Sequence, residues 1–105
     1  MISKDGVNIV SIKVLNDIQN KNVLIVDIRD RESYLRGHIP GAVYKTEMDL
    51  YKQRELLKNY DKVYIYCQYG NKGMYITQYL QEKYALSNVY NIVGGYNVYR
   101  GKIEK

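Results

Sequence analysis

The clearest pattern in the chain is a set of short apolar runs that alternate with amphipathic segments. Residues 23–28 and 62–66 are almost continuous in apolar, β-branched and aromatic side chains, as expected for strands buried on both faces. Between and after these runs, apolar residues recur three or four positions apart, which indicates helices. Strands that alternate with helices predict an α/β fold with a parallel sheet, three layers and right-handed crossovers.

Capping and breaking residues give these elements approximate bounds. Strands are predicted over residues 8–10, 23–28, 42–44, 62–66 and 89–93. Helices are predicted over residues 11–19, 30–36, 46–58, 72–84 and 96–100. Ser11 is a good N-cap for the first helix. Thr46 with Asp49 resembles a capping box, and Gly37 stops the helical turns before it.

The chain's only cysteine lies where the strongest predicted strand ends. Cys67 closes the run KVYIYC, and a loop with two glycines then leads into a helix. Backbone N–H groups in such a loop can form an anion-binding nest, and the helix N-terminus adds partial positive charge. No Asp or Glu lies between Asp61 and Glu82, whereas Lys72 lies inside the loop. The loop should therefore stabilise a thiolate, which indicates that Cys67 is a nucleophile.

The predicted topology brings further charged residues to the same place. Asp27 lies near the carboxyl end of the strand over residues 23–28, and Arg29 follows it. Open parallel α/β sheets bind their ligands outside the carboxyl ends of the strands. The fold class alone therefore predicts that an acid, Arg29 and the Cys67 loop share one rim of the sheet.

Size and charge narrow the class of protein. The 105 residues suit a single domain, residues 1–105. The net charge of +5 is scattered rather than gathered in a block, so no nucleic-acid partner is expected, although small anions would be attracted. One cysteine excludes an internal disulfide and a cysteine-based metal cluster, and neither a metal nor a cofactor is expected. Without a signal-peptide core or a run of transmembrane length, the expected location is cytoplasmic, with no membrane partner.

Three blocks of the sequence resemble those of single-domain rhodanese-like sulfurtransferases. The first block comprises DIR at 27–29, ESY at 32–34 and GHIPGA at 37–42. The second is the loop CQYGNKG at 67–73. The third is the glycine pair at 94–95, followed by Tyr99 where the family usually has Trp. The blocks occur in the family's order and spacing, and the resemblance extends over nearly the whole chain.

The resemblance implies a rhodanese-like fold, a five-stranded, mainly parallel sheet flanked by helices on both faces. It also implies a sulfurtransferase that takes sulfane sulfur onto Cys67 from a small anionic donor, thiosulfate or a persulfide. The resulting persulfide would pass its sulfur to cyanide or to a thiol, which can belong to a partner protein. The loop that would stabilise the thiolate and the persulfide consists of Gln68, Tyr69, Gly70, Asn71, Lys72 and Gly73.

The loop also departs from related patterns in two ways. Phosphatases and arsenate reductases of this fold have a longer loop with Arg six positions after the cysteine, whereas Gly73 stands there in this chain. The loop should therefore suit a sulfur atom better than a phosphate or arsenate group. Many rhodanese-like proteins carry a basic residue directly after the cysteine, whereas this chain has Gln68. This difference predicts weak use of thiosulfate.

Several nearby side chains have two interpretations. His38 could act as a general base, but its position in a tight turn favours ring hydrogen bonds to loop backbone. Asp27 could be catalytic, but a role as acceptor for backbone amides or an arginine is favoured. Arg29 and Arg36 are either solvated charges or part of a basic rim. Tyr69 could wall the pocket or face a partner.

Three other functions remain to be weighed against the enzyme. A sulfur carrier would use the same chemistry at Cys67 with little turnover of small donors. A regulatory binding module is disfavoured by the intact cysteine and its loop. A phosphatase or arsenate reductase is disfavoured by the loop length. In either sulfur-transfer function, the lone cysteine means that an external acceptor must discharge the persulfide.

Overall fold

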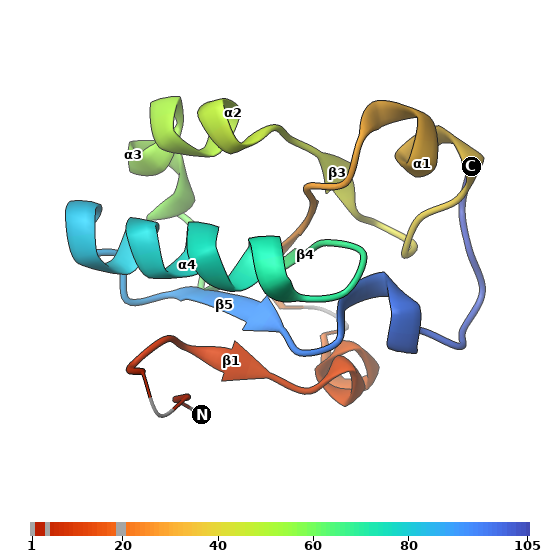
Figure 1. The fold of residues 1–105 in the computed structure, drawn as a ribbon, viewed down its shortest axis with the longest axis horizontal. Helices are drawn as coiled ribbons and strands as arrows, with labels where there is room; N and C mark the ends of the chain where they lie inside the picture. Colours follow the sequence, from red (N-terminus) through yellow and green to blue (C-terminus); the bar gives the residue numbers. More distant parts are fainter. Residues whose placement is uncertain (1, 4, 19–20) are drawn as a thin grey trace.

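A five-stranded parallel sheet forms the centre of the structure (Figure 1). The computed structural model describes residues 2–3, 5–18 and 21–105. The strands are β1 (Ile9–Val10), β2 (Val23–Asp27), β3 (Val43–Tyr44), β4 (Lys62–Tyr66) and β5 (Val89–Ile92). Their order across the sheet is β1-β5-β4-β2-β3, and each neighbouring pair is parallel. The predicted α/β fold and its parallel sheet are confirmed.

Helices lie on both faces of this sheet. They are η1 (Ile12–Asp17), α1 (Arg31–Arg36), α2 (Glu47–Lys52), α3 (Arg54–Leu57), α4 (Asn71–Tyr84) and η2 (Gly95–Val98), of which η1 and η2 are 3-10 helices. In Figure 1, α4 runs just above β5, with α2 and α3 above α4.

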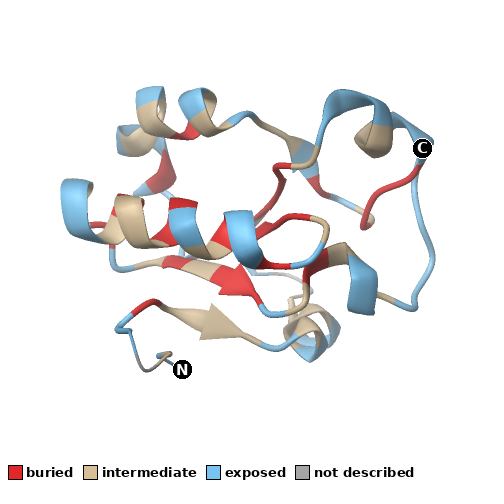
Figure 2. Cartoon of the chain, viewed as in Figure 1, coloured by how far each residue is buried: buried red, intermediate tan, exposed pale blue. Residues whose placement is uncertain are grey.

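Two separate apolar clusters, one on each face of the sheet, form the core. The cluster under α2, α3 and α4 contains Val26, Ile28, Leu50, Leu57, Val63, Ile65, Cys67, Ile76, Leu80, Leu86 and Val89. The cluster on the opposite face contains Ile25, Ile39, Ala42, Tyr64, Tyr66 and Ile92, with η1 and residues around η2 packed against it. Burial is concentrated in the central strands and in the loop that follows β4 (Figure 2). The three-layer arrangement is therefore confirmed.

The best-defined sequence signals agree closely with the structure. The predicted strand over residues 62–66 coincides with β4. The predicted capping box is present, because the Thr46 hydroxyl accepts from the Asp49 N–H and the Asp49 carboxylate accepts from the Thr46 N–H. These signals depend on local chemistry, which the sequence contains in full.

Three predicted helices need correction. The first, over residues 11–19, is the 3-10 helix η1, and Gln19 lies outside the described residues. The second, over residues 46–58, breaks into α2 and α3 at Gln53, whose backbone is not helical and whose side chain accepts from Lys45 Nζ at 2.6 Å. The last, over residues 96–100, is the 3-10 helix η2. Short segments adopt 3-10 geometry readily, and apolar spacing does not distinguish it from an α-helix.

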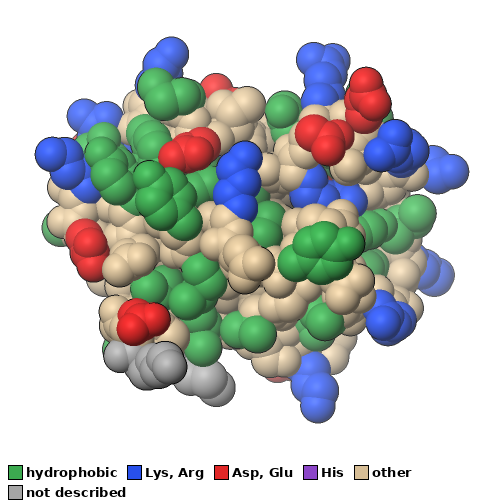
Figure 3. Space-filling view, viewed as in Figure 1, with side chains coloured by type: hydrophobic (Ala, Val, Ile, Leu, Met, Phe, Trp, Pro, Cys, Tyr) green, Lys and Arg blue, Asp and Glu red, His purple; other side chains and the backbone are tan. Residues whose placement is uncertain are grey.

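The surface agrees with the scattered charge of the sequence. On the face drawn in Figure 3, lysine and arginine side chains lie mostly around the outline and do not form one continuous block. Within the described part of the chain, none of the helices has both the length and the apolar character needed to cross a membrane.

Candidate active site

The thiol of Cys67 points toward the helix that follows it. Side chains alternate along β4, so that Val63, Ile65 and Cys67 face α4 while Tyr64 and Tyr66 face the opposite layer. Cys67 is 6% exposed and lies at the carboxyl end of the strand, under the N-terminus of α4. The strand register thus determines which face of the sheet carries the thiol.

Two backbone N–H groups form a cradle around the sulfur. The Gly70 and Gly73 amides donate to Cys67 Sγ at 3.0 and 3.3 Å. Gly73 is the third residue of α4, and its N–H is one of the donors that a helix leaves without a backbone partner. The N-cap residue, Gly70, has no side chain with which to bond it. The cysteine sulfur accepts this hydrogen bond instead, where a capping side chain usually would.

The backbone that follows the glycine pair at 94–95 supports the loop. The Tyr96 N–H donates to the Cys67 carbonyl at 2.8 Å, and the Asn97 N–H donates to the Gln68 carbonyl at 2.9 Å. A Cβ at Gly95 would collide with the Cys67 carbonyl oxygen, and Gly95 also has a φ of +61°. Glycine is therefore required there for close approach and for its backbone conformation.

An open pocket of about 540 Å³ lies over the thiol. Its lining residues are Ile28, Arg29, Asp30, Ser33, Cys67, Gln68, Tyr69, Asn71 and Lys72. A second pocket of about 250 Å³ lies beside it and shares Arg29, Ser33 and Gln68 with it. Cys67 is therefore reached from the rim of the sheet that the topology predicted.

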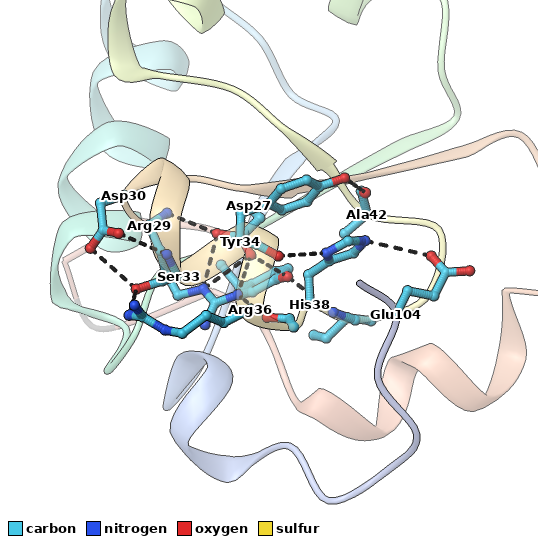
Figure 4. Close-up of polar contacts among 12 residues, drawn as sticks. Asp27, Arg29, Asp30, Ser33, Tyr34, Arg36, His38, Ala42 and Glu104 are labelled. Carbon is cyan, nitrogen blue, oxygen red and sulfur yellow. Dashed lines mark hydrogen bonds and ion pairs between the residues drawn. The ribbon is translucent and has the colours of Figure 1, made fainter.

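Asp27 and Arg29 form a buried ion pair at this rim (Figure 4). Arg29 Nη2 donates to Asp27 Oδ2 at 2.7 Å, and Arg29 Nε donates to both carboxylate oxygens at 3.0 and 3.1 Å. The Arg29 side chain is 5% exposed and that of Asp27 is fully buried. Arg29 also donates to the Gly37 carbonyl at 2.6 Å. The pair thereby ties the end of β2 to the turn that begins at Gly37.

Strand register explains a third member of this network. Asp27 and Tyr66 are partners across the β2–β4 pairing, so both side chains point to the same face. The Tyr66 hydroxyl donates to Asp27 Oδ2 at 2.6 Å and accepts from the Ile39 N–H at 3.2 Å. Burial, and then the bond to Asp27, raises the pKa of Tyr66 above its usual value. The phenol therefore stays protonated as a donor to the carboxylate.

Arg29 is also held by an aromatic face. Its guanidinium lies 3.9 Å from the centroid of the Tyr96 ring. Burial lowers the pKa of Arg29, but the hydrogen bond and charge of Asp27 outweigh it, so the net shift is upward. Arg29 was predicted to be either a solvated charge or part of a basic rim. The solvated alternative is wrong, because the side chain is buried, whereas Arg29 does line the pocket at the rim, with its charge offset by Asp27.

His38 holds backbone in place, as its turn predicted. Its ring Nδ1 donates to the Tyr34 carbonyl at 2.8 Å, and the ring stacks on Tyr34 with centroids 3.8 Å apart. Its Nε2 lies 3.6 Å from Glu104 Oε1 (Figure 4). The backbones of His38 and Glu104 also exchange two hydrogen bonds of 2.9 Å. His38 thus connects the turn to the C-terminal segment and does not line the pocket over Cys67.

The structure places the predicted site residues in different surroundings. Gln68, Tyr69, Asn71 and Lys72 line the pocket with Cys67, whereas Gly70 and Gly73 lie beneath it and contact the sulfur. Asn71 and Lys72 belong to the first turn of α4. Tyr69 is 66% exposed beside the pocket. Arg36, 71% exposed, lines the neighbouring pocket, and Asp27 is buried below the rim.

Other contributors to the site were missed from the sequence. Asp30 and Ser33 line the pocket, and Asn91, a buried polar residue in β5, donates to the loop carbonyl of Gly70 at 3.3 Å. A polar side chain inside a run of buried strand residues is the signal that could have singled out Asn91. Among the described residues, no group of three or more His, Cys, Asp or Glu side chains is arranged to hold a metal ion.

Comparison with known proteins agrees with this fold. A family model described as the rhodanese-like domain matches residues 12–102. Thiosulfate sulfurtransferase GlpE of Pseudomonas entomophila is 33% identical over 86 residues, which cover 79% of this chain and 75% of that protein.

Two solved structures show likeness of fold alone, because both are under 25% identical to the chain. A protein from Staphylococcus saprophyticus matches with a TM-score of 0.77 and 24% identity, over 93% of this chain and 99% of that one. Thiosulfate sulfurtransferase from Pseudomonas aeruginosa matches with a TM-score of 0.72 and 21% identity, over 87% of this chain and 17% of that one. On the family match and the shared fold, the chain belongs to the rhodanese-like domain family.

Proposed function

We propose that the protein transfers sulfane sulfur through a persulfide on Cys67. The thiolate attacks the sulfane sulfur of thiosulfate or of a persulfide donor. The donor's S–S bond breaks, and sulfite or a thiolate leaves with its electron pair. Cyanide or a thiolate acceptor then attacks the outer sulfur of the Cys67 persulfide. This second step forms thiocyanate or a new persulfide and restores the Cys67 thiolate.

The observation that carries this proposal is the amide cradle around Cys67 Sγ. Two fixed N–H groups at 3.0 and 3.3 Å favour negative charge on sulfur and need no rearrangement when that charge forms. The pocket of about 540 Å³ above the thiol gives a donor and an acceptor access to the same atom. Because Cys67 is the only cysteine of the chain, its persulfide has to be discharged by an external acceptor.

The space at position 73 argues against phosphatase or arsenate reductase chemistry. An arginine there would have to begin with a Cβ, and a Cβ at Gly73 would collide with Asn91 Oδ1. The arginine that the longer loops use to hold an oxyanion therefore has no room at this position. This supports sulfur, and not a phosphate or arsenate group, as the species that the loop holds.

A second candidate function is a sulfur carrier that exchanges sulfur with partner proteins. The charges around the pocket favour it, because little net positive charge faces a small anionic donor. Asp30 lies in the same lining as Lys72, and the charge of Arg29 is offset by Asp27. A carrier would form the same persulfide but turn over thiosulfate slowly.

The test is the intact mass of the protein after brief incubation with thiosulfate and, separately, with a low-molecular-weight persulfide. We expect a gain of one sulfur atom that a reductant removes. Uptake from the persulfide without thiosulfate turnover would favour the carrier. If neither donor, nor a persulfidated protein donor, adds sulfur, the proposal is wrong and the binding-module alternative takes its place.

The position after the cysteine should limit the use of thiosulfate. Gln68 lines both pockets, and an arginine there would add a charge beside the path of a dianionic donor. We expect Gln68→Arg to raise kcat/KM for thiosulfate several-fold at low salt, with a smaller gain at high salt. The measurement is thiocyanate formation from thiosulfate and cyanide.

Gln78→Arg is the matched control for this change. Gln78 lies on α4, and its side chain donates to Glu82 at 3.2 Å, away from the pocket lining. The Gln78→Arg variant adds the same charge to the molecule as Gln68→Arg, but away from the pocket. Equal kcat/KM values for the two variants would show that the residue after the cysteine does not limit thiosulfate use.

A further inference from the structure

We propose that Asn91 is a positioning residue that holds both amide donors of the Cys67 cradle in place. The inference rests on the proposed function only for the reason why a stabilised thiolate is useful. The contacts of Asn91 with the cradle do not depend on sulfur transfer. Asn91 lies on β5, next to β4 in the sheet, and is 1% exposed. Alternation along β5 places it on the same face as Val89, which belongs to the cluster under α4.

The first contact is with the loop at Gly70. Asn91 Nδ2 donates to the Gly70 carbonyl at 3.3 Å, in a buried setting. The N–H of Gly70 donates to Cys67 Sγ at 3.0 Å. Gly70 has a φ of +102°, so its peptide groups take an orientation that few other residues would maintain. The Gly70 carbonyl also accepts from the Met74 N–H at 3.1 Å, so Asn91 adds a second restraint, from β5, to the residue whose N–H faces the sulfur.

The second contact is with the first turn of α4. A Cβ at Gly73 would meet Asn91 Oδ1 first, then Asn91 Cγ at 3.2 Å and Cys67 Sγ at 3.7 Å. The Asn91 amide therefore fills the space that any side chain at position 73 would need. The N–H of Gly73 is the second donor to Sγ, at 3.3 Å. One side chain thus contacts both residues that donate to the sulfur.

Packing alone does not explain why a polar residue stands at position 91, because its polarity costs stability. Its Oδ1 is buried and has no hydrogen-bond partner among the described residues. An apolar side chain would avoid this unpaired oxygen in the buried cluster. A buried unpaired polar group in a native structure calls for an explanation. The bond that Asn91 makes to the loop, directly beneath the reactive sulfur, supplies one.

The test compares Asn91→Ala with the wild type by the rate of Cys67 alkylation with iodoacetamide across a pH series. Because Cys67 is the only cysteine, the reaction reports on that thiolate alone. We expect alkylation near neutral pH to slow by about tenfold, less than the full loss of one preorganised donor would cost. We also expect the pH profile to move to higher pH, a change that loss of packing alone would not produce.

Thr77→Val is the matched control. Thr77 is also fully buried on α4, one helical turn after Gly73, and its Oγ1 also lacks a partner among the described residues. We expect its alkylation profile to overlay that of the wild type. A folded Asn91→Ala protein with the wild-type profile would overturn the inference, and so would an equal shift in Thr77→Val.

Gly73→Ala tests the same contact from the other side. The added methyl group must displace the Asn91 amide, so we expect this variant to slow alkylation as well. In the Asn91→Ala background the same methyl group has room, so the double variant should lose less than the sum of the two single effects. Strict additivity would count against the inference.

These outcomes are separate from those of the proposed function. Alkylation requires no sulfur donor. A protein that takes sulfur from no donor, yet shows the Asn91 shift, would refute sulfur transfer and keep the positioning role. If the wild type forms the persulfide normally but Asn91→Ala has the alkylation profile of the wild type, sulfur transfer is supported and the positioning role is refuted.

Discussion

Replacing Cys67 by serine should abolish sulfur uptake and leave the fold intact. The serine hydroxyl can still accept from the Gly70 and Gly73 amides, so the loop keeps its hydrogen bonds. A hydroxyl does not ionise near neutral pH and cannot carry a persulfide. The intact mass after incubation with thiosulfate or a persulfide should therefore stay unchanged, while the circular dichroism spectrum matches that of the wild type.

Cys67→Ala separates the roles of the sulfur as nucleophile and as hydrogen-bond acceptor. Alanine leaves two buried N–H groups without a partner, so this variant should be less stable than Cys67→Ser by about 1–3 kcal/mol in urea unfolding. Both variants should be inactive. Sulfur uptake by either of them at the wild-type rate would refute the persulfide mechanism, because the chain contains no other cysteine.

Replacing Asp27 by asparagine should strongly destabilise the fold. The change removes the charge that balances Arg29, whose side chain is 5% exposed and has little access to water. Breaking a buried ion pair by neutralising one partner typically costs about 3–5 kcal/mol. Asparagine also keeps only one accepting oxygen, so it cannot accept from both the Tyr66 hydroxyl and the Arg29 N–H, which bond to different oxygens of Asp27. The free energy of unfolding in urea, compared with that of the wild type, measures the loss.

Two comparisons show whether the cost comes from an unpaired buried charge. Glu32→Gln breaks the exposed pair of Glu32 and Arg36, whose atoms are 3.9 Å apart, and should change stability little. Removing both buried partners together, as in Asp27→Leu with Arg29→Met, should cost less than Asp27→Asn alone. If Asp27→Asn lowers the free energy of unfolding no more than Glu32→Gln does, the buried ion pair does not stabilise the fold as argued.

The central part of the fold could be predicted because local pattern and tertiary environment agree there. The run over residues 62–66 is apolar at every position but the first, and β4 is buried from Val63 to Tyr66. The end of this strand, the glycines after it and the helix that follows are all local signals. They sufficed to place Cys67 beneath a helix N-terminus.

The rest of the site depends on contacts between segments far apart in the chain. Asp27 meets Tyr66 only because β2 and β4 pair in one particular register. Asn91 meets Gly70 across the β4–β5 pairing, which no local pattern specifies. The break at Gln53 likewise has no proline or glycine to mark it in the sequence. Pattern analysis identifies elements and reactive groups, but register determines which polar groups meet.

The sheet ends on both sides in a strand of two residues, β1 and β3. A long free strand edge can accept an extended segment of another protein, but two residues offer few N–H and C=O groups for such pairing. A protein that exchanges sulfur with this chain would therefore have to dock on loops and side chains and not by adding a strand. Fibrillar aggregates grow by pairing strands edge to edge, so the same short edges offer few hydrogen-bonding groups for such growth.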